Sequence, residues 1–189
     1  MGPPSVPPGH LPSRGGGRED LLQGLPPILP EGETRALILG SFPSVRSLES
    51  RQYYAHPQNW FWRVMQHCGV VADALAPYAE RVEQIRSKQL AVWDLYARVR
   101  REGSGDDAIQ EPVANPISEV CGWDIPILLN GRRLREFRRA FPKVEAELIA
   151  LPSTSPRPLH WNTEESRSAA QNEWCSALSR SLGVHTLDG

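Results

Sequence analysis

Two stretches of the sequence carry side chains that could bind a ligand and act on it. The first stretch contains two short segments, GSFPS at residues 40–44 and YYAHPQN at residues 53–59. Its glycine would let the backbone approach a ligand closely, and a tyrosine ring can stack on a flat base. Asn59 offers a donor and an acceptor from one amide. His56 could contact the ligand or hold its loop by hydrogen bonding, so its role stays open.

Asn59 also has a purely structural interpretation. It directly precedes a segment, residues 60–70, whose apolar positions recur at helical spacing, and asparagine is a favoured N-cap residue. Spacing alone favours the cap. The two roles are compatible, because a cap can hold an amide rigidly.

The second stretch, LPSTSPRP at residues 151–158, follows an apolar run with hydroxyls and prolines. Such a loop is stiff and rich in donors, which suits gripping a phosphate backbone and pushing a wedge into a duplex. A proline-rich surface loop would have the same composition. The arginines of residues 132–139 could also meet phosphates, although such clusters are more often solvated helix faces. Asp94, Asp106 and Asp107 are candidate acids, but their spacing does not make them a pair.

The composition excludes several classes of protein. The 189 residues are 40% hydrophobic and 23% charged, with a net charge of −1, so no global basic field indicates nucleic acid. No segment is a membrane span or a signal peptide, which predicts a cytoplasmic location. Walker, GxGxxG, GxSxG and HExxH motifs are absent. Cys68, Cys121 and Cys175 lie too far apart for a disulfide framework or a metal site, so we expect ordinary thiols, no metal and no cofactor.

The elements that must position these residues alternate between strands and helices. Short apolar runs predict strands at residues 35–41, 90–95, 124–131 and 146–154. Helical patterns predict helices at residues 59–70, 77–89, 132–141 and 163–182, the last opened by a capping box. This alternation favours an α/β fold with a mainly parallel sheet covered on both faces. Ligands bind such sheets at the carboxyl ends of the strands, where the residues that follow the four strands should converge.

The N-terminal segment differs from the rest of the chain. Residues 1–20 are rich in proline and glycine and nearly lack large apolar side chains, which predicts a disordered tail. The remaining residues, 21–189, are one domain's worth of chain, and we expect them to form a single domain.

The pattern GSFPSxxSLxxxxYYAHPxNxFW at residues 40–62, together with LPSTSP at residues 151–156, closely resembles the uracil-DNA glycosylase superfamily. The likeness is greatest to its hypoxanthine-DNA (deoxyinosine) glycosylase branch and extends to the mismatch-specific uracil and thymine glycosylases. It covers residues 35–182. The resemblance implies a three-layer α/β/α sandwich with a central four-stranded, mainly parallel sheet. It also implies a monofunctional enzyme that needs no metal and hydrolyses the N-glycosidic bond of a damaged base.

Two positions depart from the family pattern. Phe42 stands where most members have the Asp or Asn that positions the attacking water, and Leu151 replaces the His or Asn that begins the second motif. The resemblance implies that Asn59 takes over the water and that Tyr54 stacks on the flipped base. Without a charged group at the two motif positions, catalysis would rest on positioning and on hydrogen bonds to the leaving base, so we expect a slow enzyme with a narrow substrate range.

The resemblance assigns the remaining roles. Asn59 is the candidate catalytic residue, and the candidate base-binding residues are Gly40, Ser41, Phe42, Pro43, Tyr54 and His56. The candidate DNA-binding residues are Ser153, Thr154, Ser155, Pro156 and Arg157. The expected partner is damaged DNA, bound by a monomer, with hypoxanthine as the favoured base. Two alternatives stay open, a mismatch-specific uracil/thymine-DNA glycosylase and a catalytically weak lesion-binding protein of the same fold.

Overall fold

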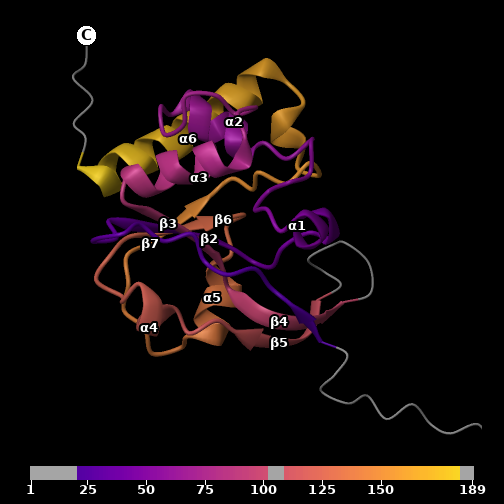
Figure 1. The fold of residues 1–189 in the computed structure, drawn as a ribbon, viewed down its shortest axis with the longest axis vertical. Coiled ribbons are helices and arrows are strands. Elements are labelled where there is room, and N and C mark those ends of the chain that lie inside the picture. The colour runs from indigo at the N-terminus through magenta and orange to yellow at the C-terminus, as the bar shows by residue number, and fades with distance from the viewer. Residues whose placement is uncertain (1–20, 102–108, 184–189) are drawn as a thin grey trace, which may run out of the picture.

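A four-stranded parallel sheet forms the centre of the protein, as the sequence predicts. The structure, a computed structural model, describes residues 21–101 and 109–183 (Figure 1). The strand order is β3-β2-β6-β7, and every pairing in this sheet is parallel. The strands are β2 (Ala36–Gly40), β3 (Leu90–Asp94), β6 (Ile127–Asn130) and β7 (Leu148–Leu151).

The apolar sequences of these strands follow from burial on both faces. Every residue of β2, β3 and β6 is buried, so neither face of the sheet tolerates the polar alternation of a solvent-facing strand. In the register, Gly40 pairs with Asp94 and Asn130 pairs with Leu151. The last residues of neighbouring strands therefore lie at one edge of the sheet.

Helices cover both faces of the sheet and complete the predicted three-layer sandwich (Figure 1). One layer holds α2 (Phe61–His67), α3 (Tyr78–Ser87) and α6 (Glu164–Leu182), and the opposite layer holds α4 (Ile117–Val120) and α5 (Leu134–Ala140). The short α1 (Val45–Ser50) follows β2. Thr163 caps α6 by accepting a hydrogen bond from the N–H of Ser166 at 3.2 Å, which confirms the predicted cap, although the side chain of Ser166 bonds to the carbonyl of His160 at 3.0 Å and not back to the N–H of Thr163.

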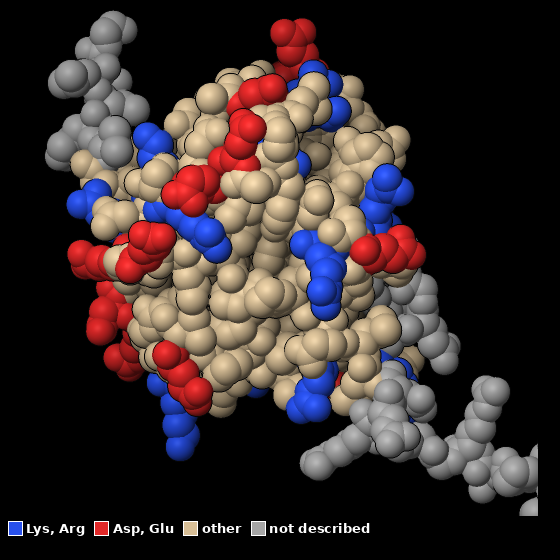
Figure 2. Space-filling model, viewed as in Figure 1, with Lys and Arg blue, Asp and Glu red and all other residues tan. Residues whose placement is uncertain are grey.

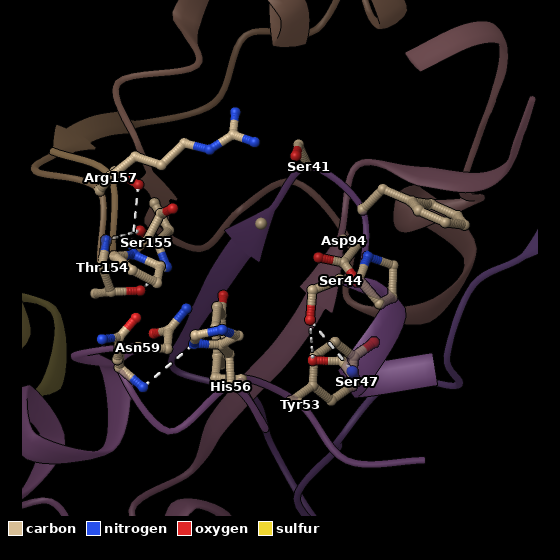
Figure 3. A pocket seen from close by; sticks show the side chains of 18 residues that line it. Ser41, Ser44, Ser47, Tyr53, His56, Asn59, Asp94, Thr154, Ser155 and Arg157 are labelled. Carbon is tan, nitrogen blue, oxygen red and sulfur yellow. Dashed lines mark hydrogen bonds between the residues drawn. The ribbon is translucent and has the colours of Figure 1, made fainter. Parts of the chain in front are cut away.

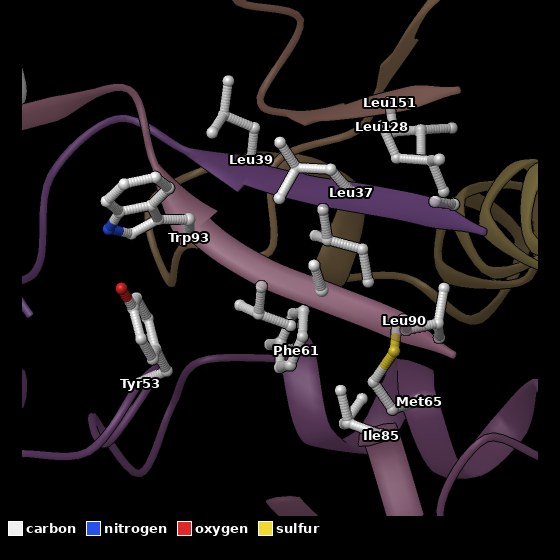
Figure 4. Packing of buried hydrophobic residues seen from close by; sticks show 14 of the residues in the cluster. Leu37, Leu39, Tyr53, Phe61, Met65, Ile85, Leu90, Trp93, Leu128 and Leu151 are labelled. Carbon is white, nitrogen blue, oxygen red and sulfur yellow. The ribbon is translucent and has the colours of Figure 1, made fainter. Parts of the chain in front are cut away.

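The core between the sheet and the α2–α3 layer is aromatic and aliphatic. Phe61 and Met65 of α2 and Ile85 of α3 are fully buried and face the sheet beside Leu90 (Figure 4). Trp174 of α6 is also fully buried, and its Nε1 donates to the carbonyl of Pro152 at 2.9 Å. Burial of these large side chains is the main source of stability that holds the sheet edge in place.

A second, antiparallel sheet lies beside the sandwich, and the sequence did not predict it. It contains β1 (Leu22–Gln23), β4 (Tyr96–Arg101) and β5 (Ile109–Ala114) in the order β1-β4-β5. Most residues of β5 are partly or fully exposed, and the register of β4 with β5 shifts twice. Strands of this kind lack the apolar run and the strict alternation by which strands are recognised in sequence.

The expectation of three ordinary thiols is wrong. Cys68 at the end of α2 and Cys175 in α6 form a disulfide bond, with their Cα atoms 5.0 Å apart. Their sequence separation of 107 residues gives no local signal, because only the packing of α2 against α6 brings them together. Cys121 is a free thiol, and burial raises its pKa to about 11, so it stays protonated near neutral pH.

Two further findings concern the described residues alone. None of the helices between residues 21 and 183 that the structure describes has the length and hydropathy needed to cross a membrane. Within the same residues, no cluster of three or more His, Cys, Asp or Glu side chains could hold a metal ion. The predicted tail, residues 1–20, lies outside the described residues, and so do Asp106 and Asp107.

Candidate active site

A cavity of about 330 Å³ opens at the carboxyl edge of the parallel sheet (Figure 3). The ends of three strands contribute to its wall through Gly40 of β2, Asp94 of β3 and Asn130 of β6. Every predicted site residue lines this cavity: Gly40, Ser41, Phe42, Pro43, Tyr54, His56, Asn59, Ser153, Thr154, Ser155, Pro156 and Arg157. The convergence expected from the strand ends is therefore confirmed, while the chemical role of each residue stays a prediction.

Asn59 supports the start of α2 from one residue before the N-cap, which is Trp60, and still reaches the cavity. Its Oδ1 accepts a hydrogen bond from the backbone N–H of Phe61, the first residue of α2, at 2.9 Å. Its own N–H donates to the carbonyl of His56 at 2.8 Å. The amide is partly exposed and held in one orientation at the cavity wall, as a residue that directs a water molecule must be.

His56 holds its loop by hydrogen bonding, which was one of its two expected roles. Its Nδ1 accepts from the backbone N–H of Gln58 at 3.2 Å. Its carbonyl accepts from Asn59, so the histidine fixes the turn that precedes the catalytic candidate. The ring also lines the cavity, so the contact with a ligand remains an expectation.

Tyr54 is fixed by packing and by an uncommon backbone conformation. Its ring stacks on Phe61 with the centroids 3.8 Å apart and the planes 18° apart. Its φ angle of 55° lies in the left-handed region, which is uncommon for a residue with a Cβ, and Tyr54 is the one such residue among those that line the cavity in the described part of the chain. Because Phe61 covers one face of the ring, a base can stack only on the other face.

The turn that carries Tyr54 is anchored on both sides. The N–H of Tyr53 donates to the hydroxyl of Tyr78 at 3.1 Å, and the hydroxyl of Tyr53 donates to the carbonyl of Leu25 at 3.2 Å. The indole Nε1 of Trp62 donates to the carbonyl of Tyr53 at 3.1 Å. These three contacts, from separate parts of the chain, over-determine the turn and explain how the strained neighbour is maintained.

Gly40 creates the room that the cavity floor requires. A methyl group at this position would collide with Oδ1 of Asp94 and would lie 3.3 Å from the hydroxyl of Tyr54. Asp94 is only 4% exposed, and its backbone carbonyl accepts from Nδ2 of Asn115 at 2.8 Å. The sequence marks Asp94 as a candidate acid without an acidic partner, and it is not among the predicted site residues. Its position shows that the cavity does contain a carboxyl group.

The second motif is held by a reciprocal side-chain pair. Nδ2 of Asn130 donates to Oγ1 of Thr154 at 2.9 Å, and the N–H of Thr154 donates to Oδ1 of Asn130 at 2.9 Å. Thr154 has no exposed surface. Its carbonyl accepts from the N–H of Trp60 at 2.9 Å, which joins this loop to the loop of Asn59. The side chain of Thr154 thus positions the loop, leaving its neighbours to face the solvent.

The exposed residues of this loop are supported from behind. The carbonyl of Ser153 accepts from Nε1 of Trp161 at 2.8 Å, and Nε2 of His160 lies 2.9 Å from the same oxygen. The N–H of Ser155 donates to Oγ of Ser153 at 3.2 Å. Pro156 and Arg157 are exposed at the cavity rim. A rigid loop with an exposed tip is suited to contact with a nucleic-acid backbone.

Charge is dispersed over the protein surface. On the face shown in Figure 2, basic and acidic side chains are interspersed and do not form one continuous basic area. In the arginine-rich segment, Arg132 pairs with Glu173 at 2.8 Å and Arg133 pairs with Glu136 at 3.1 Å. These ion pairs favour the interpretation of the segment as a solvated face. Arg157 lies apart from this segment, at the rim of the cavity.

Comparison with known proteins places the fold and the site in a family. Residues 26–179 match the Uracil DNA glycosylase superfamily. A protein named hypoxanthine DNA glycosylase from Methanosarcina barkeri is 29% identical over 163 residues, which cover 84% of this chain and 98% of that protein. One of the same name from Methanosarcina acetivorans is 33% identical over 140 residues, covering 71% of this chain and 87% of that protein.

A solved structure agrees with these matches. The solution NMR structure of a Methanosarcina acetivorans protein assigned to the uracil DNA glycosylases is 26% identical and superposes with a TM-score of 0.68. The superposition covers 85% of this chain and 98% of that one. The matched residues include both motifs and all four strands of the central sheet. The chain therefore belongs to the uracil DNA glycosylase superfamily and is a DNA glycosylase.

Proposed function

We propose that this enzyme removes hypoxanthine from DNA by hydrolysing the bond between the base and its deoxyribose, leaving an abasic site. The observation that carries the proposal is that Asn59 and Tyr54 lie in one cavity with the hydroxyl-rich loop of residues 153–157. The cavity volume of about 330 Å³ is at the lower end for small-molecule pockets and suits a single base turned out of the duplex. The names of the two relatives favour hypoxanthine among the deaminated bases.

Asn59 orients the attacking water. One lone pair of its Oδ1 is taken by the N–H of Phe61, so the second can accept from a water molecule in a fixed direction. An amide is no effective general base, but an oxocarbenium-like sugar needs a well-placed water more than a strong nucleophile. Tyr54 holds the base against its accessible ring face, and backbone groups of Ser41 and Phe42 read the edge of the base.

The loop of residues 153–157 holds the DNA. Ser153 and Ser155 contact phosphates, while Thr154 keeps the loop in place through Asn130. Pro156 and Arg157, at the exposed tip, occupy the space that the base vacates in the stack. We further propose that the enzyme acts as a monomer in the cytoplasm.

The departures from the family pattern limit the rate. Leu151 is 2% exposed at the end of β7 and does not line the cavity, and the side chain of Phe42 is apolar. Neither can donate a hydrogen bond to a leaving base. We therefore expect slower cleavage than by relatives that carry charged or polar groups at these positions.

A substrate panel tests the proposal. Purified protein is incubated with duplexes that carry hypoxanthine, uracil, thymine or xanthine opposite each normal base, and abasic sites are cleaved with alkali. Strand breaks that form fastest at hypoxanthine support the proposal. Faster cleavage at uracil or thymine favours the mismatch-specific alternative, whereas tight, salt-sensitive binding without strand breaks favours the lesion-binding alternative.

A further inference from the structure

The carboxyl group of Asp94 is the one acidic side chain that the described residues place in the cavity wall (Figure 3). It lies at the end of β3, with 4% of the residue exposed. Gly40 on the neighbouring strand leaves just enough space for it, and Asn115 fixes its backbone. The fold thus holds this acid tightly in the wall of the cavity that is proposed to receive the base.

The charge on this group decides what it can do. When the bond between sugar and base breaks, its electron pair stays with the base, so negative charge develops there. An ionised carboxylate in the same cavity would oppose that charge, whereas a protonated carboxyl would stabilise it by donating a hydrogen. Removal of a carboxyl from water favours the protonated form. A buried acid in this position is therefore a candidate proton donor.

Several ionisable groups lie near this carboxyl. Burial, and next the negative charge that Asp94 carries when ionised, raise the pKa of Tyr53, so this neighbour is a neutral phenol and adds no charge beside Asp94. The hydroxyl of Tyr54 lies against the same position above Gly40. His56 and Arg157 also line the cavity, and of the two Arg157 is exposed at the rim, where it faces solvent and DNA.

We propose that Asp94 is the general acid that protonates the departing base at N7, an inference that rests on the proposed action on hypoxanthine. N7 is a ring acceptor of every purine. The carboxyl O–H bond breaks and the proton bonds to N7 while the C1′–N9 bond breaks and its electron pair enters the ring. Hypoxanthine leaves uncharged. The oxygen of the water held by Asn59 bonds to C1′, and the proton that this water loses returns through solvent to the carboxylate of Asp94.

The first test replaces the acid. Asp94→Asn keeps the shape of the side chain but has no proton to transfer, so single-turnover cleavage of an inosine duplex should fall by about 10²–10⁴-fold. Wild-type cleavage should slow as the pH rises through the titration of the acid, and the variant should lose this dependence. The matched control is Asp124→Asn, the same change at an exposed aspartate outside the cavity, which should leave the rate unchanged.

The second test changes the substrate and needs no variant. A duplex with 7-deazainosine has a carbon in place of N7, so wild-type cleavage should fall by a similar factor, and Asp94→Asn should slow it no further. Wild-type cleavage of 7-deazainosine at the rate of inosine overturns the proposal. So does an equal loss on both substrates in Asp94→Asn, because that result assigns Asp94 to another edge of the base.

The proposed function and the role of Asp94 can be refuted separately. Absence of inosine cleavage by the wild-type protein overturns both the proposed function and the role of Asp94. Normal inosine cleavage by Asp94→Asn, with an unchanged pH profile, overturns the role of Asp94 alone. Binding to a duplex with non-hydrolysable 2′-fluoro-deoxyinosine shows whether the variant still holds its substrate.

Discussion

Asn59 both holds the first N–H of α2 through its side chain and lines the cavity, and one substitution series can separate the two roles. Asn59→Ala removes the acceptor for the N–H of Phe61, a bond of 2.9 Å at the start of the helix. Loss of an N-cap side chain costs about 0.5–2 kcal/mol, which in a domain of this size lowers Tm by roughly 1–8 °C. The same change removes the group proposed to direct the water. Loss of one preorganised group of this kind typically slows catalysis by about 10²–10³-fold, or roughly 2.7–4 kcal/mol.

Asn59→Asp separates these effects. The aspartate keeps an oxygen for the N–H of Phe61, so its Tm should stay near that of the wild type. It also keeps an acceptor for water and adds the ability to take its proton, so cleavage should remain within about tenfold of the wild-type rate. The assay is single-turnover cleavage of an inosine duplex with the enzyme in excess, followed by alkali.

A cap far from the cavity serves as the control. Thr163 caps α6 through a bond of 3.2 Å from the N–H of Ser166, and neither residue lines the cavity. Thr163→Ala should lower Tm by a similar amount and leave the rate unchanged. If Asn59→Ala loses stability but cleaves at the wild-type rate, its amide is a cap and nothing more, and the proposed mechanism is refuted.

Three further outcomes follow from the contacts described above. The disulfide between α2 and α6 closes a loop of 107 residues, so its reduction should remove up to about 5 kcal/mol of stability. A thermal scan with reductant should then show Tm lower by roughly 10–20 °C. An unchanged Tm contradicts the bond. Asn130→Ala leaves the N–H of the buried Thr154 without its partner, so urea titrations should show a free energy of unfolding lower by about 1–3 kcal/mol. Asn130→Asp should lose less stability than Asn130→Ala, because an oxygen that can accept from this N–H remains. Gly40→Ala should displace the carboxyl of Asp94 and slow inosine cleavage by about 10²-fold or more without unfolding the sheet, and a wild-type rate would show that the cavity floor yields easily.

Much of the fold could be predicted because its central strands are buried on both faces. A short apolar run such as ALILG in β2 is typical of a strand in that environment, and parallel pairing then brings the strand ends to one edge. This convergence of strand ends gathers the site residues, but it does not determine which of them are exposed. Thr154 was expected to contact phosphate, yet it is fully buried, because its hydroxyl is turned toward Asn130.

The features that escaped prediction depend on distant contacts. The disulfide requires α2 and α6 to pack together, and no pattern near Cys68 or Cys175 reports this. The strands β4 and β5 pair with each other through a register that shifts twice; β5 is exposed along its length, and β4 buries Tyr96 and Val99 between polar residues, so neither has the apolar run of a buried strand. The sequence identifies Asp94 as a candidate acid, but only the tight contact of its carboxyl with the position above Gly40 shows how closely the fold encloses it.

The hydrogen bond between the N–H of Trp60 and the carbonyl of Thr154 has a mechanical consequence. It joins the loop of Asn59 to the loop of residues 153–157, and this connection favours a cavity that is already formed before DNA binds. A preformed cavity does not close around the base to draw it out, so the free-energy cost of unpairing and unstacking depends strongly on the base pair itself. Base pairs that are already weak, as those of a deaminated base are, would then open more often than normal pairs. Deaminated bases would therefore enter the cavity more often, before any contact with the base itself distinguishes them.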